Sequence, residues 1–186
     1  MEIIELVIDE NEEFSGIEAI SVVESPAIEE DFIALKNEDK IRLAEVSKEK
    51  RLLIGGALIP DRPIYRKNGD HEFYIYFSKE TVAKASQMFL QAGNQGQATM
   101  EHTDNKLEGM TVVESWLVED AVHDKSRKYG LDMPIGTWMV SMKVDNDDIW
   151  NNYVKKNKIK GFSIEGYFID RLSERPKDKQ TDKLSQ

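Results

Sequence analysis

The sequence contains no cysteine, only three histidines and no long run of apolar residues. Without cysteine the chain cannot form disulfides, use a thiolate nucleophile or build a zinc site from cysteine ligands, which is compatible with a reducing cytoplasm. No apolar segment approaches the roughly 20 residues that a membrane-spanning helix needs, and the acidic N-terminus differs from a basic signal peptide. We therefore expect a protein that makes no use of membranes.

Basic residues are also in deficit, with 25 Lys and Arg against 35 Asp and Glu, for a net charge of −10. Nucleic-acid binding depends on lysine and arginine side chains that neutralise phosphates, so we expect no nucleic-acid partner. The 186 residues are 40% hydrophobic and 32% charged. This composition is typical of one globular domain with short tails.

Two segments resemble ligand-binding loops, but each lacks residues that such a loop requires. Residues 145–148 (DNDD) lack the glycine and the distal glutamate of a calcium loop, so we interpret them as a helix cap. Residues 93–96 (GNQG) are not followed by Gly-Lys-Ser/Thr, which argues against a phosphate-binding loop. We expect no metal and no cofactor.

The apolar pattern predicts a mainly β protein with two helices. Strands are predicted where apolar residues are bounded by turn residues: 1–9, 17–23, 52–59, a hairpin around Asn68 and Gly69 that returns over 71–77, 112–119, 136–144 and the segment around Ser163. Ser78 is predicted to cap a helix that ends at Gly93, and a second helix is expected after residues 145–148. We divide the chain into N-terminal strands with a charged linker (1–50), a core (51–170) and a charged tail (171–186).

Residues 160–168 (KGFSIEGYF) carry the strongest chemical signal in the chain, because they place Ser163 between glycines inside an apolar strand. Glycines let a peptide backbone approach closely, which suits a nucleophile that must reach an extended substrate. His102 ends the short segment 99–102 (TMEH), and histidine is the side chain best suited to accept a serine proton near neutral pH. On residue types and spacing alone, the simpler interpretation is that Ser163 is a small strand residue and His102 caps a loop.

The other histidines and serines fit the same roles less well. His71 lies beside the predicted hairpin turn and His123 in a polar stretch, so both are expected to be solvated. Ser115 and Ser141 also lie in predicted strands, but neither has glycines on both sides. Ser115 is the next candidate nucleophile.

Four motifs in a fixed order resemble the prohead, or capsid-maturation, proteases of tailed phages, and most closely their XkdF-like serine protease branch. The motifs are residues 100–102, 113–120, 134–144 and 161–167, and the resemblance runs from about residue 51 to residue 168. In those families a strand ending in histidine supplies the base, and a later glycine-flanked serine strand supplies the nucleophile. The resemblance thus implies His102 and Ser163 as the catalytic pair.

The resemblance leaves the third catalytic residue open. In the better-known prohead proteases a glutamate follows the serine strand, but the segment most similar to theirs here is residues 17–27, ahead of the core, which a circular permutation would explain. Its carboxylate is Glu18, one residue out of register, and one residue turns a strand side chain to the other face. Glu18 is our candidate acid, with Glu24, Asp104, Glu114 or no acid at all as alternatives.

The resemblance also implies a fold and a set of partners. The phage proteases are related to the herpesvirus maturation protease, so we expect a closed or nearly closed β-barrel with peripheral helices. The implied substrates are scaffold and capsid proteins and the protease itself, cut inside the immature capsid in the host cytoplasm. The alternative hypothesis is an inactive protein of the same fold that binds scaffold or capsid without cutting. The sequence leaves the oligomeric state open, a homo-oligomer included.

Overall fold

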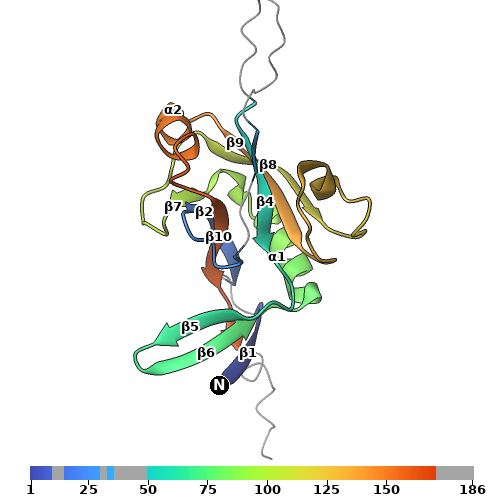
Figure 1. Ribbon diagram of the computed structural model, residues 1–186. Helices are drawn as coiled ribbons and strands as arrows, with labels where there is room; N and C mark the ends of the chain where they lie inside the picture. Colours follow the sequence, from blue (N-terminus) through green and yellow to red (C-terminus); the bar gives the residue numbers. More distant parts are fainter. Residues whose placement is uncertain (10–14, 30–32, 36–49, 171–186) are drawn as a thin grey trace, which may run out of the picture.

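The computed structural model describes residues 1–9, 15–29, 33–35 and 50–170. Its strands form three small sheets (Figure 1), with the strand orders β11-β1-β6-β5, β10-β2-β7 and β3-β4-β9-β8. The strand bounds are β1 Glu2–Val7, β2 Gly16–Val23, β3 Ile33–Leu35, β4 Leu52–Leu58, β5 Ile64–Asn68, β6 His71–Tyr76, β7 Ala98–Met100, β8 Met110–Leu117, β9 Trp138–Val144, β10 Gly161–Tyr167 and β11 Ile169–Asp170. The predicted strands are confirmed, although most are shorter than the apolar runs that indicated them.

The sheet β3-β4-β9-β8 supplies much of the core. Strand β9 is buried along almost its whole length, and its Trp138 is fully enclosed. The predicted helix is α1, Lys79–Gln91, and it starts as expected, because the Ser78 hydroxyl accepts the Thr81 amide. Phe89 of α1 packs edge-to-face on Trp138, with ring centroids 5.4 Å apart. This contact joins the helix to the central strand of the sheet.

The second predicted helix is found over residues 147–154. It consists of α2, Asp147–Ile149, followed by a single π-helical turn, Trp150–Val154. Asn146 caps it by accepting the Ile149 amide with its side chain. The capping interpretation of residues 145–148 is therefore confirmed.

The sheet β10-β2-β7 is the smallest of the three and is central to the site. Strand β2 lies between the other two, antiparallel to β10 and parallel to β7. Ser163 is paired with Ser21, and Ser21 with Thr99, so three hydroxyl side chains lie in one row across the sheet. The register of β10 shifts between Glu165 and Gly166. Because Gly166 lies so close to β2 that a Cβ atom there would be only 2.1 Å from the Gly16 carbonyl oxygen, glycine is required for this backbone packing.

The third sheet stands at one end of the molecule, where the β5–β6 hairpin extends beside β1 (Figure 1). The hairpin turns at Gly69, which has a φ of +61°, as the Asn-Gly pair predicted. Strand β1 pairs in parallel with β6, and β11 pairs antiparallel with β1. Residues from both ends of the described chain thus complete the sheet that carries the hairpin.

The predicted closed or nearly closed barrel is wrong. None of the three sheets closes or curls into a barrel, and the only α-helices in the described ranges are α1 and α2. The strands that would have to join the sheets pair elsewhere: β5 pairs with β6 and β6 with β1, while β7 pairs only with β2 among the named strands. An alternating apolar pattern identifies a strand that is half buried, but it does not specify the neighbouring strand.

The N-terminal strands belong to the same structure as the predicted core, because β1 pairs with β6 and β2 with β10. Residues 16–23 therefore form the middle strand of the site sheet. The proposed charged tail (171–186) and most of the linker lie outside the described residues. The division at residues 50 and 170 stays a prediction.

Candidate active site

Ser163 lies in the first half of β10, where the strand is buried, and only 8% of its surface is exposed. Its neighbour across the sheet, Ser21, is completely buried. A serine with so little exposure needs a partner for its hydroxyl group. That partner is the ring of His102, whose Nε2 atom lies 2.9 Å from Ser163 Oγ.

His102 does not lie in a strand but in the turn that follows β7. The backbone reverses there through two consecutive residues with positive φ, Glu101 at +51° and His102 at +56°. Such conformations are uncommon for residues other than glycine, and they are held in place by surrounding contacts. The His102 amide donates to Ser21 Oγ at 3.0 Å, and the Glu101 carboxylate accepts the Glu24 amide at 2.6 Å. Both contacts attach the turn to β2 and its continuation.

Glu165 accepts a hydrogen bond from the other nitrogen of the histidine ring. His102 Nδ1 lies 3.0 Å from Glu165 Oε1, and Thr99 Oγ1 donates to the same oxygen at 2.6 Å. Glu165 follows Ser163 by two residues in β10, so both side chains are on one face of the strand. The exposed fractions of the side chains are 27% for Glu165 and 46% for His102, so the ring is open to solvent on one side.

The arrangement defines which nitrogen of a neutral ring carries the proton. An ionised carboxylate can only accept hydrogen bonds, so Nδ1 must donate to Glu165. Nε2 is then the unprotonated nitrogen and can accept the Ser163 hydroxyl proton. Serine, histidine and glutamate are thus connected in the order that nucleophilic catalysis by a serine requires.

The structure brings Ser163 and His102 together but does not bring Glu18 to them. Glu18 is three residues from Ser21 along β2, which places the two side chains on opposite faces of the strand. Its side chain is exposed and lines a different hollow with residues of the α1 side, including Met88 and Asn94. Glu18, which is one residue out of register in the sequence, therefore lies on the face of β2 that points away from Ser163 and His102.

The other carboxylates considered from the sequence are also not partners of His102. Glu24 interacts with the site turn only through its backbone amide, and Asp104 is exposed in the loop after β7. Glu114 lies on β8 and forms an ion pair with Lys125, which lowers the pKa of Glu114 below its usual value. Among the described residues, the carboxylate that contacts the His102 ring is that of Glu165.

The strand that carries Ser163 and the strand that leads to His102 belong to one sheet but are not neighbours. Strand β2 lies between β10 and β7, and the side chain of His102 bridges the gap because it extends from the turn beyond β7. Sequence reasoning missed two residues of the site, Glu165 and Ser21. A signal for Glu165 was present, since Ser-x-Glu in a strand always places both side chains on one face.

The other two histidines and Ser115 have different partners. His71 lies 3.0 Å from Glu2 in the hairpin sheet, and His123 lies 3.0 Å from Asp120, three residues earlier. Ser115 Oγ accepts the Trp138 indole N–H at 2.8 Å. None of these contacts joins a serine to a histidine.

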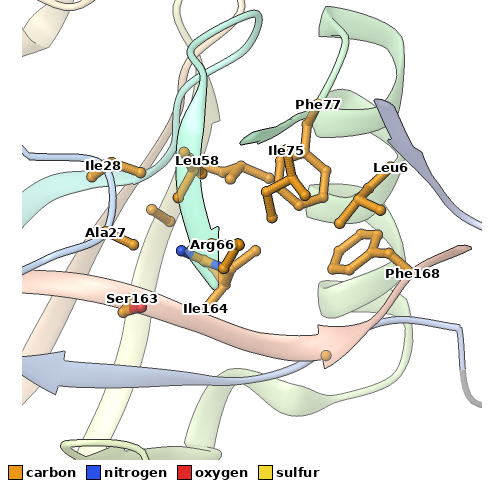
Figure 2. Close-up of a pocket in the computed structure, with 13 residues that line it drawn as sticks. Leu6, Ala27, Ile28, Leu58, Arg66, Ile75, Phe77, Ser163, Ile164 and Phe168 are labelled. Carbon is orange, nitrogen blue, oxygen red and sulfur yellow. The ribbon is translucent and has the colours of Figure 1, made fainter. Parts of the chain in front are cut away.

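A cavity of about 210 Å³ opens beside Ser163. Figure 2 shows the residues around it, which come from β1, β4, the β5–β6 hairpin, β10 and the segment after β2. The wall is apolar except at Ser163 and Arg66, and it is formed by Leu6, Ala27, Ile28, Ala57, Leu58, Ile64, Ile75, Phe77, Ile164, Gly166 and Phe168. The nucleophile candidate therefore lies at the edge of a space that a substrate side chain could fill.

The family model described as "Putative phage serine protease XkdF" matches residues 39–170, which is more than half of the chain. The chain belongs to this family. Comparisons with curated proteins and with solved structures found no match. The family description supports a phage serine peptidase, and the matched range includes His102, Ser163 and Glu165. The range does not include β2, although β2 contributes Ser21 to the site.

Proposed function

We propose that this protein is a serine endopeptidase with Ser163 as nucleophile, His102 as general base and Glu165 as the residue that orients His102. The observation that carries the proposal is the continuous set of contacts from Ser163 Oγ to His102 Nε2 (2.9 Å) and from His102 Nδ1 to Glu165 (3.0 Å). Distances of this size are within the range that proton transfer requires. Family membership supports the same activity independently of the geometry.

The steps follow from the positions of the groups. Ser163 Oγ attacks the carbonyl carbon of a peptide bond while His102 Nε2 takes the hydroxyl proton. The tetrahedral intermediate collapses when His102 returns that proton to the leaving amine, which leaves an acyl group on Ser163. A water molecule, deprotonated by His102, then attacks the acyl carbon. The bond from that carbon to Ser163 Oγ breaks as His102 returns the proton to Oγ, which releases the acid and restores the enzyme.

Glu165 acts on the histidine and not on the substrate. Its carboxylate holds Nδ1–H, which keeps the ring in the tautomer that accepts the serine proton and stabilises the imidazolium that forms. Thr99 donates to the same carboxylate oxygen at 2.6 Å and so fixes its position. In this proposal Thr99 and Ser21 are positioning residues, one for the acid and one for the histidine turn.

The substrates we propose are scaffold and capsid proteins of the phage head, cleaved within the immature capsid. Membership of a phage serine protease family supports a viral role, and capsid maturation is the proteolytic step that the prohead-protease resemblance implies. No helix of the described residues is long and apolar enough to cross a membrane.

A serine-reactive fluorophosphonate probe tests the catalytic part of the proposal. The wild-type chain should be labelled at Ser163, as located by mass spectrometry, and Ser163→Ala should not be labelled. His102→Ala should also lose labelling, because the hydroxyl is a weak nucleophile without its base. A wild-type chain that is folded but resists the probe would favour the alternative, an inactive protein that binds head proteins.

The substrate part needs a separate experiment. The chain would be co-expressed with the scaffold and major capsid proteins of its phage, and the products would be analysed by mass spectrometry. We expect defined cleavage sites in these proteins with the wild type and none with Ser163→Ala. Probe labelling without cleavage of either protein would retain the peptidase and reject these substrates.

A further inference from the structure

The cavity beside Ser163 contains one charged side chain, that of Arg66 on β5. All of the other residues that line it are apolar or glycine, apart from Ser163 itself. Figure 2 shows the nitrogen atoms of Arg66 directed toward the side of the cavity on which Ala27 and Ser163 lie. Arg66 and Ser163 therefore line the same cavity.

Arg66 has no carboxylate partner among the described residues. Its guanidinium donates to the Tyr65 carbonyl at 2.9 Å, a contact within its own strand. The next residue, Lys67, is paired across the hairpin with Glu72 at 3.7 Å, so the hairpin does supply a carboxylate to a neighbouring cation. Arg66 is exposed, yet the protein around its guanidinium lowers its pKa, and an arginine remains charged at neutral pH even so.

A guanidinium without an acidic partner retains several donors in a planar fork that matches the two oxygens of a carboxylate. The apolar wall beside it, which includes Leu58 and Ile164, would contact the methylene groups of a side chain on its way to Arg66. The cavity volume of about 210 Å³ is smaller than the roughly 300–1,000 Å³ of sites for whole small ligands, so it suits one amino-acid side chain.

We propose that this cavity is the specificity pocket of the peptidase and that Arg66 selects an acidic side chain, with glutamate preferred, on the substrate residue next to the scissile bond. This inference rests on the proposed function of Ser163. Glutamate fits better than aspartate because its longer stem can contact the apolar wall while its carboxylate reaches Arg66. Arg66 thus determines specificity by direct contact with the substrate.

Peptide pools in which one position is fixed as glutamate, glutamine, lysine or leucine, and the others are randomised, test this pocket. Mass spectrometry would locate the cleaved bonds. We expect cleavage next to glutamate to be about 10- to 100-fold faster than next to glutamine, which is less than a fully buried polar site achieves because Arg66 is exposed. Equal cleavage of the glutamate and glutamine pools would overturn the proposal.

Variants of Arg66 make the test specific to this side chain. Arg66→Gln should remove the preference for glutamate, and Arg66→Glu should reverse it in favour of lysine, while both retain fluorophosphonate labelling. Lys67→Gln is the matched control, since it removes a neighbouring positive charge that points away from the cavity residues, and it should keep the wild-type preference. If the Arg66 variants instead cleave all pools more slowly to the same extent and are labelled less by the fluorophosphonate probe, Arg66 acts at the reacting carbonyl. That result would contradict its role in selecting the substrate side chain.

A binding experiment separates failure of the pocket from failure of the catalytic proposal. The Ser163→Ala chain would be titrated with the fixed-glutamate and fixed-glutamine pools while the Arg66 Nε–H resonance is followed by NMR. If the Arg66 resonance shifts with the glutamate pool and not with the glutamine pool, the pocket is supported even if the wild type proves inactive. No difference between the two pools would reject the pocket even if the wild type is a competent peptidase.

Discussion

Two regions of this molecule contain serine, histidine and a carboxylate, and only one of them connects these groups. In the sheet β10-β2-β7, His102 contacts both Ser163 and Glu165. Around β8 and the loop after it, Ser115, Glu114, Asp120 and His123 lie within residues 114–123, closer together in sequence than His102 and Ser163. There His123 pairs with Asp120, Glu114 with Lys125, and Ser115 accepts from Trp138.

The difference lies in what holds the histidine. His123 is exposed, with 82% of its side chain accessible, and its partner is three residues earlier in the same loop. His102 is fixed by its own backbone, because a turn with positive φ at two residues is bonded to the buried Ser21 of β2. A histidine becomes a candidate base when its backbone is attached to the strand that pairs with the nucleophile. Residue types alone do not distinguish the two regions.

The largest effect is expected from Ser163→Ala. Removing the hydroxyl group leaves a small residue in a buried strand, so the fold should persist while peptide cleavage falls by on the order of 10⁶-fold. Cleavage of a fluorogenic peptide pool and the thermal unfolding midpoint measure the two properties. Ser115→Ala is the comparison from the other region, and it should retain cleavage while it loses the hydrogen-bond acceptor of Trp138. If Ser115→Ala abolishes cleavage and Ser163→Ala does not, the nucleophile is Ser115 on β8.

Glu165→Gln should have the next largest effect. Glutamine keeps the shape of the side chain but removes the charge that stabilises imidazolium, and its amide can donate to Nδ1 and stabilise the wrong tautomer. The loss of the equivalent charge in a serine protease triad costs about 10⁴ in rate. We expect kcat to fall by up to that factor, while the circular dichroism spectrum stays that of the folded wild type.

Glu18→Gln is the matched control for Glu165→Gln, since it makes the same chemical change in the adjacent strand of the same sheet. Glu18 is exposed and on the opposite face of β2 from Ser21, so we expect wild-type kcat for this variant. A large loss with Glu18→Gln and none with Glu165→Gln would restore the acid that the sequence pattern favoured.

Ser21→Ala should have a smaller effect that acts through the histidine turn. The variant leaves the His102 amide without its acceptor, and an unsatisfied donor of this kind costs about 1 to 3 kcal/mol. We expect lower thermal stability together with a fall in kcat of roughly tenfold, because the ring is held less firmly against Ser163. Ser141→Ala, a change at another fully buried strand serine, should leave kcat unchanged. Equal losses of kcat in both variants would mean that general destabilisation, and not the turn, is responsible.

Local features of the fold could be predicted from the sequence. The Ser78 cap, the hairpin at Gly69 and most strand positions follow from turn residues and apolar spacing, which act over a few residues. The arrangement of strands into three sheets could not, because pairing depends on contacts between distant segments. The parallel pairing of β2 with β7 is an example, since residues 16–23 and 98–100 are joined only in the folded chain.

The site shows the same limit at the level of single residues. Ser163 and His102 were identified because nucleophile and base belong to recognisable segments, and the structure places them in contact. The acid was sought in residues 17–27 because those residues resemble a family segment. That segment does contribute to the site, but through the hydroxyl of Ser21 and not through a carboxylate. Family resemblance located the strand, and only the register showed which of its side chains faces the histidine.

The smallest effect is expected in the region that lacks a connected site, from Asp120→Asn. Hydrogen bonds from the backbone and ring of His123 and from the Val122 amide lower the pKa of Asp120 from 3.8 to about 2. An acid with a lowered pKa stabilises the folded state at pH values above its unfolded pKa, and this stabilisation is lost as the pH falls through its folded pKa. The wild type should therefore lose this contribution between about pH 4 and pH 2. Because Asp120 is on the surface, the contribution is small.

Asp120→Asn should unfold at a slightly lower temperature than the wild type at pH 7, and the difference should disappear near pH 2, while peptide cleavage at neutral pH is unchanged. Glu119→Gln is the control variant, because it removes the same charge one residue away and leaves the hydrogen bonds of Asp120 in place. A loss of cleavage in Asp120→Asn would mean that the loop after β8 takes part in the reaction, and the distinction between the two regions would fail.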